Sequence, residues 1–321
     1  MFSLCLGDLL SRRKSMALSL ALGNTGFRWV FGDIHKQGHL QFKRILACGG
    51  GEPAQPIGDD GLWSAASLCA VLEGVISGLP THVGKPNFVV FSVPSKNAYL
   101  GEVVVPRDES DSMIRFRIQD LMQAAAGDTR REAAFDWQTK AALADDSLSL
   151  AVAGIDQKQV DEILQACASH KLDCLGVTLD CVAALNGYLQ MAPESVKQAN
   201  VKFLLHGELD RHRIRLAVFS HGMLINESWD QNDDGFSVVQ AVAALERLVV
   251  SWVRDGLPDE VASVRLILGG ELMYTKTCES TAQRSQVLAP RLLAISPRKE
   301  IASSWHDDVV PYGALEAMPC E

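Results

Sequence analysis

The stretch MALSLALGNTGFRWVFGD, residues 16–33, decides how the rest of the chain is interpreted. Its two apolar segments, 16–22 and 26–35, predict the strands of a β-hairpin, because a cluster of glycine and polar residues separates them. The turn consists of Gly23, Asn24, Thr25 and Gly26. Glycine and asparagine suit a turn that needs positive φ, but successive backbone N–H groups in such a turn also form a concave anion site. The stretch therefore predicts either a plain hairpin or a loop that cradles a phosphate.

Length and composition predict a folded, acidic protein of two lobes or domains. The chain has 321 residues, and domains usually have roughly 150. Hydrophobic residues make up 47%, enough for a packed core, and the net charge of −9 argues against a broad nucleic-acid surface. No run of about 18 uncharged apolar residues predicts a membrane span. A basic region followed by a short apolar run, 11–22, imitates a secretory signal, but we expect that run to form the first strand.

Strands and helices are predicted to alternate over the first 190 residues. Beyond the hairpin, strands are predicted at 39–48, 86–94, 99–107, 133–140, 147–155 and 172–180, and helices at 62–79, 109–125, 156–171 and 181–191. Asp156 is placed to cap the third of these helices. The run Gly49-Gly50-Gly51 lies in a predicted loop, 49–61. Because it precedes no helix and lacks the Lys-Ser/Thr of a Walker motif, we interpret it as a flexible linker.

The residues from 201 onward repeat the order of the first half. Strands are predicted at 201–206, 211–220, 222–229 and 263–270, a long helix at 236–254, and a short final helix within 309–318. Each half thus begins with three strands, continues with a helix and reaches a buried strand, at 88–93 and 264–268, although no sequence period links the halves. Two ribonuclease-H-like lobes fit this order. The predicted fold class is therefore α/β, with the architecture of the actin-like ATPases.

The sequence gives little evidence for a metal site or a hydrolase site. The chain has eight cysteines but no C-x-x-C, and most lie in apolar periodic segments, which predicts buried thiols in a reducing compartment. The densest group contains Cys167, His170, Cys174 and Cys181. Its seven-residue spacings match no common zinc finger, so we expect no zinc site. His221 suggests a hydrolase, but no nucleophile elbow accompanies it, and we interpret it as a turn residue.

Several segments resemble a known family in their order and spacing. They are LSLALGNTGFRWV, VVFSVPSKNAYLGEVVVP, LSLAVAGIDQKQVDEILQACASHKLDCLGVTLDCVAAL, FLLHGELDRHRIRLAVFSHGMLINESW, VRLILGGELMY and YGALEAM. The chain resembles the PilM-type, MshI-like cytoplasmic proteins of type IV pilus and MSHA pilus assembly. These belong to the actin-like ATPase superfamily and are related to the cell-division protein FtsA. The resemblance covers nearly the whole chain, and no single motif carries it.

Three positions depart from the pattern of that family. Its aspartate in the first strand falls on Ala21, its lysine after the turn on Arg28, and its aspartate in the second hairpin on Leu205. In ATPases of this architecture those carboxylates hold Mg²⁺ under the phosphates. The resemblance therefore implies a degenerate nucleotide site, with Glu208 as the nearest substitute ligand. The residues that would line a residual ATP site, in one cleft between the lobes, are Gly23, Asn24, Thr25, Gly26, Arg28, Gly207, Gly269 and Gly270. We expect no metal site, no catalytic residue and no hydrolysis.

The resemblance implies a scaffold at the cytoplasmic face of the inner membrane. Such a scaffold couples cytoplasmic pilus machinery, motor components included, to the inner-membrane assembly complex by binding the N-terminal cytoplasmic peptide of a PilN-like protein. The expected parts are a tail, 1–15, with weak membrane contact; a first lobe, 16–190, with a small subdomain inserted at about 98–155 that forms a wall of the peptide groove; and a second lobe, 191–321. The alternatives are an active actin-like ATPase or sugar kinase, and the cytoplasmic part of a type II secretion platform protein.

Overall fold

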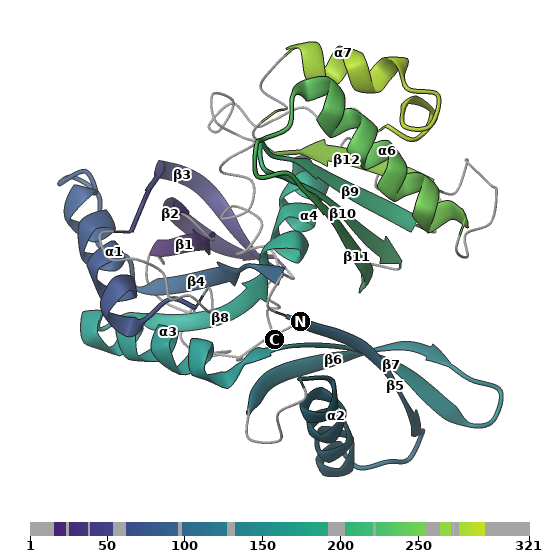
Figure 1. Ribbon diagram of the computed structural model, residues 1–321. Coiled ribbons are helices and arrows are strands. Elements are labelled where there is room, and N and C mark those ends of the chain that lie inside the picture. Colours follow the sequence, from purple (N-terminus) through teal and green to yellow (C-terminus); the bar gives the residue numbers. More distant parts are fainter. Residues whose placement is uncertain are drawn as a thin grey trace. The chain divides into compact units, whose positions relative to one another are not determined.

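The computed structural model (Figure 1) describes residues 16–23, 26–37, 39–53, 62–95, 98–126, 132–191, 203–220, 223–254, 264–270, 272 and 276–292. The chain separates into two compact units that meet in the sequence between Gly187 and Tyr188, and each is described by itself. Among these residues, no helix is long and apolar enough to cross a membrane. The predicted tail, 1–15, and the predicted final helix, within 309–318, lie outside the described residues.

A five-stranded sheet in the order β3-β2-β1-β4-β8 forms the centre of the first unit. Its strands are β1 (Met16–Leu22), β2 (Phe27–Gln37), β3 (His39–Gly51), β4 (Phe88–Val93) and β8 (Asp173–Leu179). The first three pair antiparallel, as the hairpin sequence predicts, whereas β4 runs parallel to β1 and β8 parallel to β4. Every residue of β1 and β4 is buried. The middle of the sheet is therefore covered on both faces, as is usual for parallel strands.

Helices α1 (Ala65–Gly78) and α3 (Gln157–His170) pack against each other in the first unit. Asp156 caps α3 as predicted, because its carboxylate accepts a hydrogen bond from the Lys158 N–H at 2.9 Å. The start of α1 is held by α3: the Trp63 N–H donates to Gln159 Oε1 at 2.9 Å, and Gln159 Nε2 donates to the Trp63 carbonyl at 3.2 Å. These bonds satisfy the backbone N–H and C=O groups of Trp63 beside the start of α1, where the helix itself offers no hydrogen-bond partners.

A second, three-stranded sheet lies between β4 and α3 in the sequence. It contains β5 (Tyr99–Pro106), β6 (Ala133–Ala142) and β7 (Ser147–Asp156) in the antiparallel order β5-β7-β6, and α2 (Asp111–Ala126) covers one face. The buried residues between α2 and the sheet are Val103, Val105, Ile114, Ile118, Met122, Leu150 and Val152. Helix α4 (Asp180–Met191) follows β8.

The second unit repeats the strand order of the first. Its sheet has the order β11-β10-β9-β12, formed by β9 (Phe203–Leu209), β10 (Arg213–Ser220), β11 (Met223–Gln231) and β12 (Val264–Gly269). The first three strands are antiparallel and β12 is parallel to β9, as β4 is to β1. The predicted duplication of topology without a sequence repeat is therefore confirmed.

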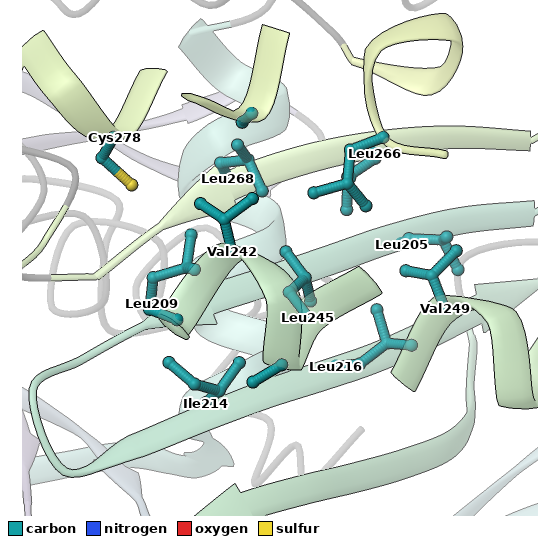
Figure 2. Packing of buried hydrophobic residues seen from close by; sticks show 14 of the residues in the cluster. Leu205, Leu209, Ile214, Leu216, Val242, Leu245, Val249, Leu266, Leu268 and Cys278 are labelled. Atoms are coloured by element: carbon teal, nitrogen blue, oxygen red, sulfur yellow. The ribbon is translucent and has the colours of Figure 1, made fainter. Parts of the chain in front are cut away.

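Helix α6 (Val238–Arg254) covers one face of the second sheet (Figure 2). Its inward side meets alternate residues of β9, β10 and β12 in a single apolar cluster. The helix lies unusually close to the sheet at Gly207, where a Cβ atom would lie 2.7 Å from the Leu245 side chain. A larger residue at position 207 would therefore force the Leu245 side chain to shift.

The run Gly49-Gly50-Gly51 is not a linker, which corrects the sequence interpretation. These residues end strand β3 and pair with Trp29, Arg28 and Phe27 of β2. A Cβ at Gly49 would lie 3.0 Å from the Trp29 ring, and one at Gly50 would collide with the Arg28 side chain. Glycine lets large side chains of the neighbouring strand lie across β3, an arrangement that sequence periodicity does not reveal.

Two further sequence predictions need correction in the second unit. The first strand was expected to end at residue 206, but β9 continues to Leu209, which is fully buried and pairs with Ile214. Helix α7 (Lys276–Arg284) and the short 3₁₀ helix η4 (Ala289–Arg291) were not predicted. Both lie in a polar or irregular stretch, where the apolar period of 3.6 residues is weak.

Truncating Leu245 tests the packing of α6. Leu245 is fully buried in the cluster, so Leu245→Ala should lower the free energy of unfolding by about 2–5 kcal/mol through lost burial and the cavity left behind. Val239, on the same helix, is 64% exposed. Val239→Ala should therefore change the free energy of unfolding by less than about 0.5 kcal/mol. Urea unfolding followed by circular dichroism measures both. Equal effects of the two substitutions would contradict this packing.

Candidate functional site

The turn after β1 is held by its own backbone and by Trp63. The Gly23 N–H donates to the Gly26 carbonyl at 2.7 Å, and the Gly23 carbonyl accepts from the Trp63 indole N–H at 3.1 Å. Neither glycine has positive φ, contrary to the expectation from sequence. Instead, a Cβ at Gly26 would lie 2.8 Å from the Gly51 carbonyl oxygen. Asn24 and Thr25 lie outside the described residues. The Gly23 N–H is therefore already used and is not available to an anion.

Arg28 lies in β2, two residues after this turn, and its side chain lies against Gly50 of β3. Arg28 pairs with Ala21 of β1 on one side and with Gly50 of β3 on the other. A Cβ at Gly50 would meet the Cδ and Nε atoms of Arg28, so the side chain lies across β3 rather than across β1.

Ala21, near the carboxyl end of β1, has no side-chain oxygen that could bind a metal. Ala21 is 8% exposed and pairs with Arg28 of β2 and with Ser92 of β4. Ser19 and Ser92 are fully buried on the same face, and their hydroxyl groups have no hydrogen-bond partner. Within the described ranges, no group of three or more His, Cys, Asp and Glu side chains is placed to hold a metal ion.

Asp180 is a carboxylate that the sequence analysis missed. It follows directly after β8, and the carboxyl ends of the parallel strands β1, β4 and β8 lie at the same edge of the sheet. Its Oδ1 accepts hydrogen bonds from the N–H groups of Ser95, at 3.0 Å, and Cys181, at 2.7 Å. Asp180 thus ties the segment after β4 to the start of α4. An acidic residue between a buried strand and a helix was the available signal.

Leu205 and the glycines of the second unit belong to its packing. Leu205, at the position of the family's second aspartate, is fully buried in the apolar cluster beneath α6. Gly270 has φ +95°, and a Cβ there would lie 2.6 Å from the Leu209 backbone nitrogen. Gly269 pairs with Glu208. The structure therefore brings Gly207, Glu208, Gly269 and Gly270 together where β9 and β12 end.

Glu208 is engaged in an ion-pair network on the face of the second sheet opposite α6. Arg215 has no exposed surface and pairs with Glu208 at 2.5 Å and with Glu227 at 3.4 Å. The guanidinium groups of Arg213 and Arg215 lie over the Trp229 ring, 4.7 and 5.4 Å from its centroid. A carboxylate held by a buried arginine is a poor replacement for a free Mg²⁺ ligand, because the metal would have to displace that cation.

The cysteines considered as a zinc site are packed as thiols. Cys167 of α3 is 2% exposed. A hydrogen bond from the Cys167 thiol to the Cys174 sulfur, together with burial, raises the pKa of Cys167, and the same bond lowers the pKa of Cys174. Burial alone raises the pKa of Cys278 to about 11. Buried, protonated thiols such as Cys167 and Cys278 are not the thiolates that zinc requires.

Comparison with solved structures identifies the fold. The chain is similar to a chain in the solved structure of a PilM–PilN type IV pilus biogenesis complex, with a TM-score of 0.66 and 12% identity over 95% of this chain and 98% of that one. It is also similar to the cytoplasmic domain of EpsL, an inner-membrane component of the type II secretion system of Vibrio cholerae (TM-score 0.48, 14% identity, 80% and 83% of the two chains). A further similar structure is a Bacteroides thetaiotaomicron protein with an actin-like ATPase fold (TM-score 0.46, 13% identity, 90% and 94%).

No protein-family model matches the chain, and no curated protein sequence matches it. The repeated strand order and the similarity to this chain of the PilM–PilN complex confirm the predicted fold class. The protein has an α/β fold of the actin-like ATPase type.

Removing the buried arginine tests the ion-pair network. Arg215→Met removes the buried cation that pairs with both Glu208 and Glu227 and should lower the free energy of unfolding by about 3–5 kcal/mol. The matched control is Arg247→Met, which breaks the exposed Arg247–Asp230 pair and should cost at most about 1 kcal/mol. Adding Glu208→Gln to Arg215→Met should recover part of the loss. A double variant as unstable as the sum of the two single variants would contradict a coupled network.

Calorimetric titration with ATP, with and without Mg²⁺, tests the nucleotide site. Because Ala21 and Leu205 provide no oxygen and Glu208 is held by Arg215, we expect weak or no ATP binding, no dependence on Mg²⁺ and no hydrolysis. An active actin-like ATPase measured in parallel is the positive control. Micromolar, Mg²⁺-dependent binding would contradict the degenerate site.

Proposed function

We propose that the protein is a non-enzymatic scaffold of type IV pilus biogenesis, of the MSHA type. It acts at the cytoplasmic face of the inner membrane and couples cytoplasmic pilus components, the motor included, to the inner-membrane assembly complex. Its membrane partner is a PilN-like protein, whose N-terminal cytoplasmic peptide binds the first lobe. The observation that supports this proposal is the end-to-end similarity to a chain of a PilM–PilN type IV pilus biogenesis complex, over 95% of this chain and 98% of that one.

The state of the candidate site favours a scaffold over an ATPase or a sugar kinase. Phosphoryl transfer needs a metal, charge stabilisation and a positioned nucleophile. The two positions where the family has aspartates are Ala21 and Leu205, the latter fully buried in apolar packing. The Arg28 side chain lies against Gly50 of β3. A nucleotide would have to bind without these contacts, so any residual ATP site is expected to lack catalytic function.

The mode of partner binding follows from the kind of peptide expected. An extended segment gains affinity from backbone hydrogen bonds and specificity from side-chain pockets. In our proposal, the small sheet β5-β7-β6 with α2, which is inserted in the first unit, forms one wall of the groove. The tail, 1–15, with its three consecutive cations, contributes only weak membrane contact, about 1 kcal/mol per cation near an anionic surface.

Membrane recovery in two deletion strains tests this proposal. Deleting the gene for the PilN-like partner should release most of the protein to the soluble fraction. Deleting residues 1–15 should reduce recovery only modestly and leave binding of the partner's cytoplasmic peptide intact, as measured by fluorescence anisotropy.

The opposite pattern would contradict the scaffold mechanism. If the protein stays on membranes without the partner and leaves them when the tail is removed, lipid contact is the main attachment. If the partner's peptide does not bind the purified protein, the PilN-like partner is wrong even when membrane recovery depends on another protein.

A further inference from the structure

The outer edge of β3 is an open strand edge in the first unit. β3 is the terminal strand of the five-stranded sheet, and no described strand pairs with its other side. Several of its residues are exposed along this edge: Lys43, Arg44, Cys48, Gly50 and Gly51. A strand edge carries a row of backbone N–H and C=O groups that can pair with another chain.

The last five residues of β3 are the regular part of this edge. Register shifts occur between Phe31 and Gly32 and between Asp33 and Ile34 of the neighbouring strand, and such bulges protect an edge from pairing. From the pair Phe31–Ala47 to the pair Phe27–Gly51, however, the register is unbroken. Residues 47–51 therefore offer a regular edge for pairing.

The three glycines make this edge accessible to another backbone. Gly49 and Gly50 accommodate the side chains of Trp29 and Arg28. A Cβ at Gly51 would meet Phe27 only at an ordinary 3.5 Å, so the chain's own packing does not require glycine there. Each glycine in a strand costs roughly 0.5–1 kcal/mol relative to alanine. Such a residue often marks close approach of another backbone.

The charges of β2 and β3 indicate what kind of partner would bind at the edge of β3. The chain has a net charge of −9, but β2 and β3 together contain four Lys or Arg residues and one Asp, a net of +3, with no Glu. The basic residues are Arg28, Lys36, Lys43 and Arg44, and the acidic one is Asp33, which pairs with Arg44 at 3.0 Å. The exposed cations Arg28, Lys43 and Arg44 favour an acidic partner.

Two of the other strand edges of the first unit, those of β8 and β6, are protected. At the far edge of the same sheet, β8 is buried from Leu175 to Leu179. In the small sheet, β6 carries a register shift between Thr139 and Ala141, and its Lys140 is paired with Glu102 of β5. Bulges and charged residues are common protections of edge strands. The end of β3 lacks both.

We propose that β3 binds an acidic, extended segment of a partner protein, which adds a strand along residues 47–51. The backbone of the segment pairs with the edge, and its carboxylates lie near Arg28, Lys43 and Arg44. A peptide fits this surface better than a lipid membrane does, because unpaired backbone groups are costly in hydrocarbon. This surface is distinct from the groove proposed for the membrane partner and does not depend on it.

Three labelled decapeptides and the Cys48 thiol test the proposal in the full-length protein. The peptides alternate valine with glutamate, valine with lysine, or valine with glutamate with every second N–H methylated. By fluorescence anisotropy, the glutamate peptide should bind about tenfold or more tightly than the lysine peptide. Methylation should remove most of the affinity, because strand addition needs the peptide N–H groups. Binding should slow alkylation of the exposed Cys48, measured by peptide mass spectrometry, in proportion to the fraction bound.

A charge reversal with a matched control locates the site. Lys43→Glu should weaken the glutamate peptide about tenfold and strengthen the lysine peptide. Lys85→Glu makes the same change at another exposed position of the first unit and should leave both affinities unchanged. Circular dichroism confirms that both variants fold.

Four outcomes would overturn the proposal. Equal binding of the glutamate and lysine peptides would show that charge does not select the occupant. Equal binding of the methylated peptide would show electrostatic attraction without strand addition. Unchanged Cys48 alkylation would place the peptide elsewhere. Binding to phosphatidylglycerol vesicles that Lys43→Glu abolishes, without binding of the glutamate peptide, would identify a lipid surface instead.

Discussion

Burial of β1 on both faces is the constraint on which the first unit depends. All seven residues of Met16–Leu22 are buried, because β1 is the central strand, with β2 antiparallel on one side and β4 parallel on the other. A carboxylate in such a strand is costly unless a metal or another partner compensates its charge. Ala21 avoids that cost. The tight packing at the centre of the sheet and the absence of a carboxylate at position 21 are therefore two aspects of one feature.

The two faces of the sheet in the second unit are packed differently. One face of β9 and β10 is apolar and lies under α6, with Gly207 allowing the close approach of Leu245. The opposite face contains the buried Arg215 between the carboxylates of Glu208 and Glu227. Breaking a buried pair is costly because it leaves a charge without compensation. Glu208 is therefore held in place by its ion pair with Arg215, independently of any ligand.

The sequence was informative where one periodicity or one cap determines an element. The apolar run of β1 and the capped helix α3 with Asp156 followed from local pattern, and the repeated order of strands and helices predicted the fold class. Failures occurred where neighbouring strands determine the outcome. Gly49-Gly50-Gly51 resembles a linker, but Trp29 and Arg28 of β2 make it a strand. Asp180 was missed because its two backbone partners include Ser95, 85 residues away in the sequence.

Packing contacts explain the glycines of the candidate site without reference to a nucleotide. Gly23 and Gly26 close a turn against each other and against Gly51, Gly207 receives Leu245, and Gly270 has positive φ beside Leu209. Each therefore has a reason in the packing of its own unit, and a glycine pattern of this kind is what the fold requires with or without a nucleotide. Evidence for nucleotide chemistry must come from oxygen ligands and free cations. At Ala21 and Leu205 the oxygens are missing, and the side chain of Arg28 lies against Gly50 of β3. Because function belongs to individual sites and not to a fold, the glycine pattern alone is no evidence for nucleotide chemistry.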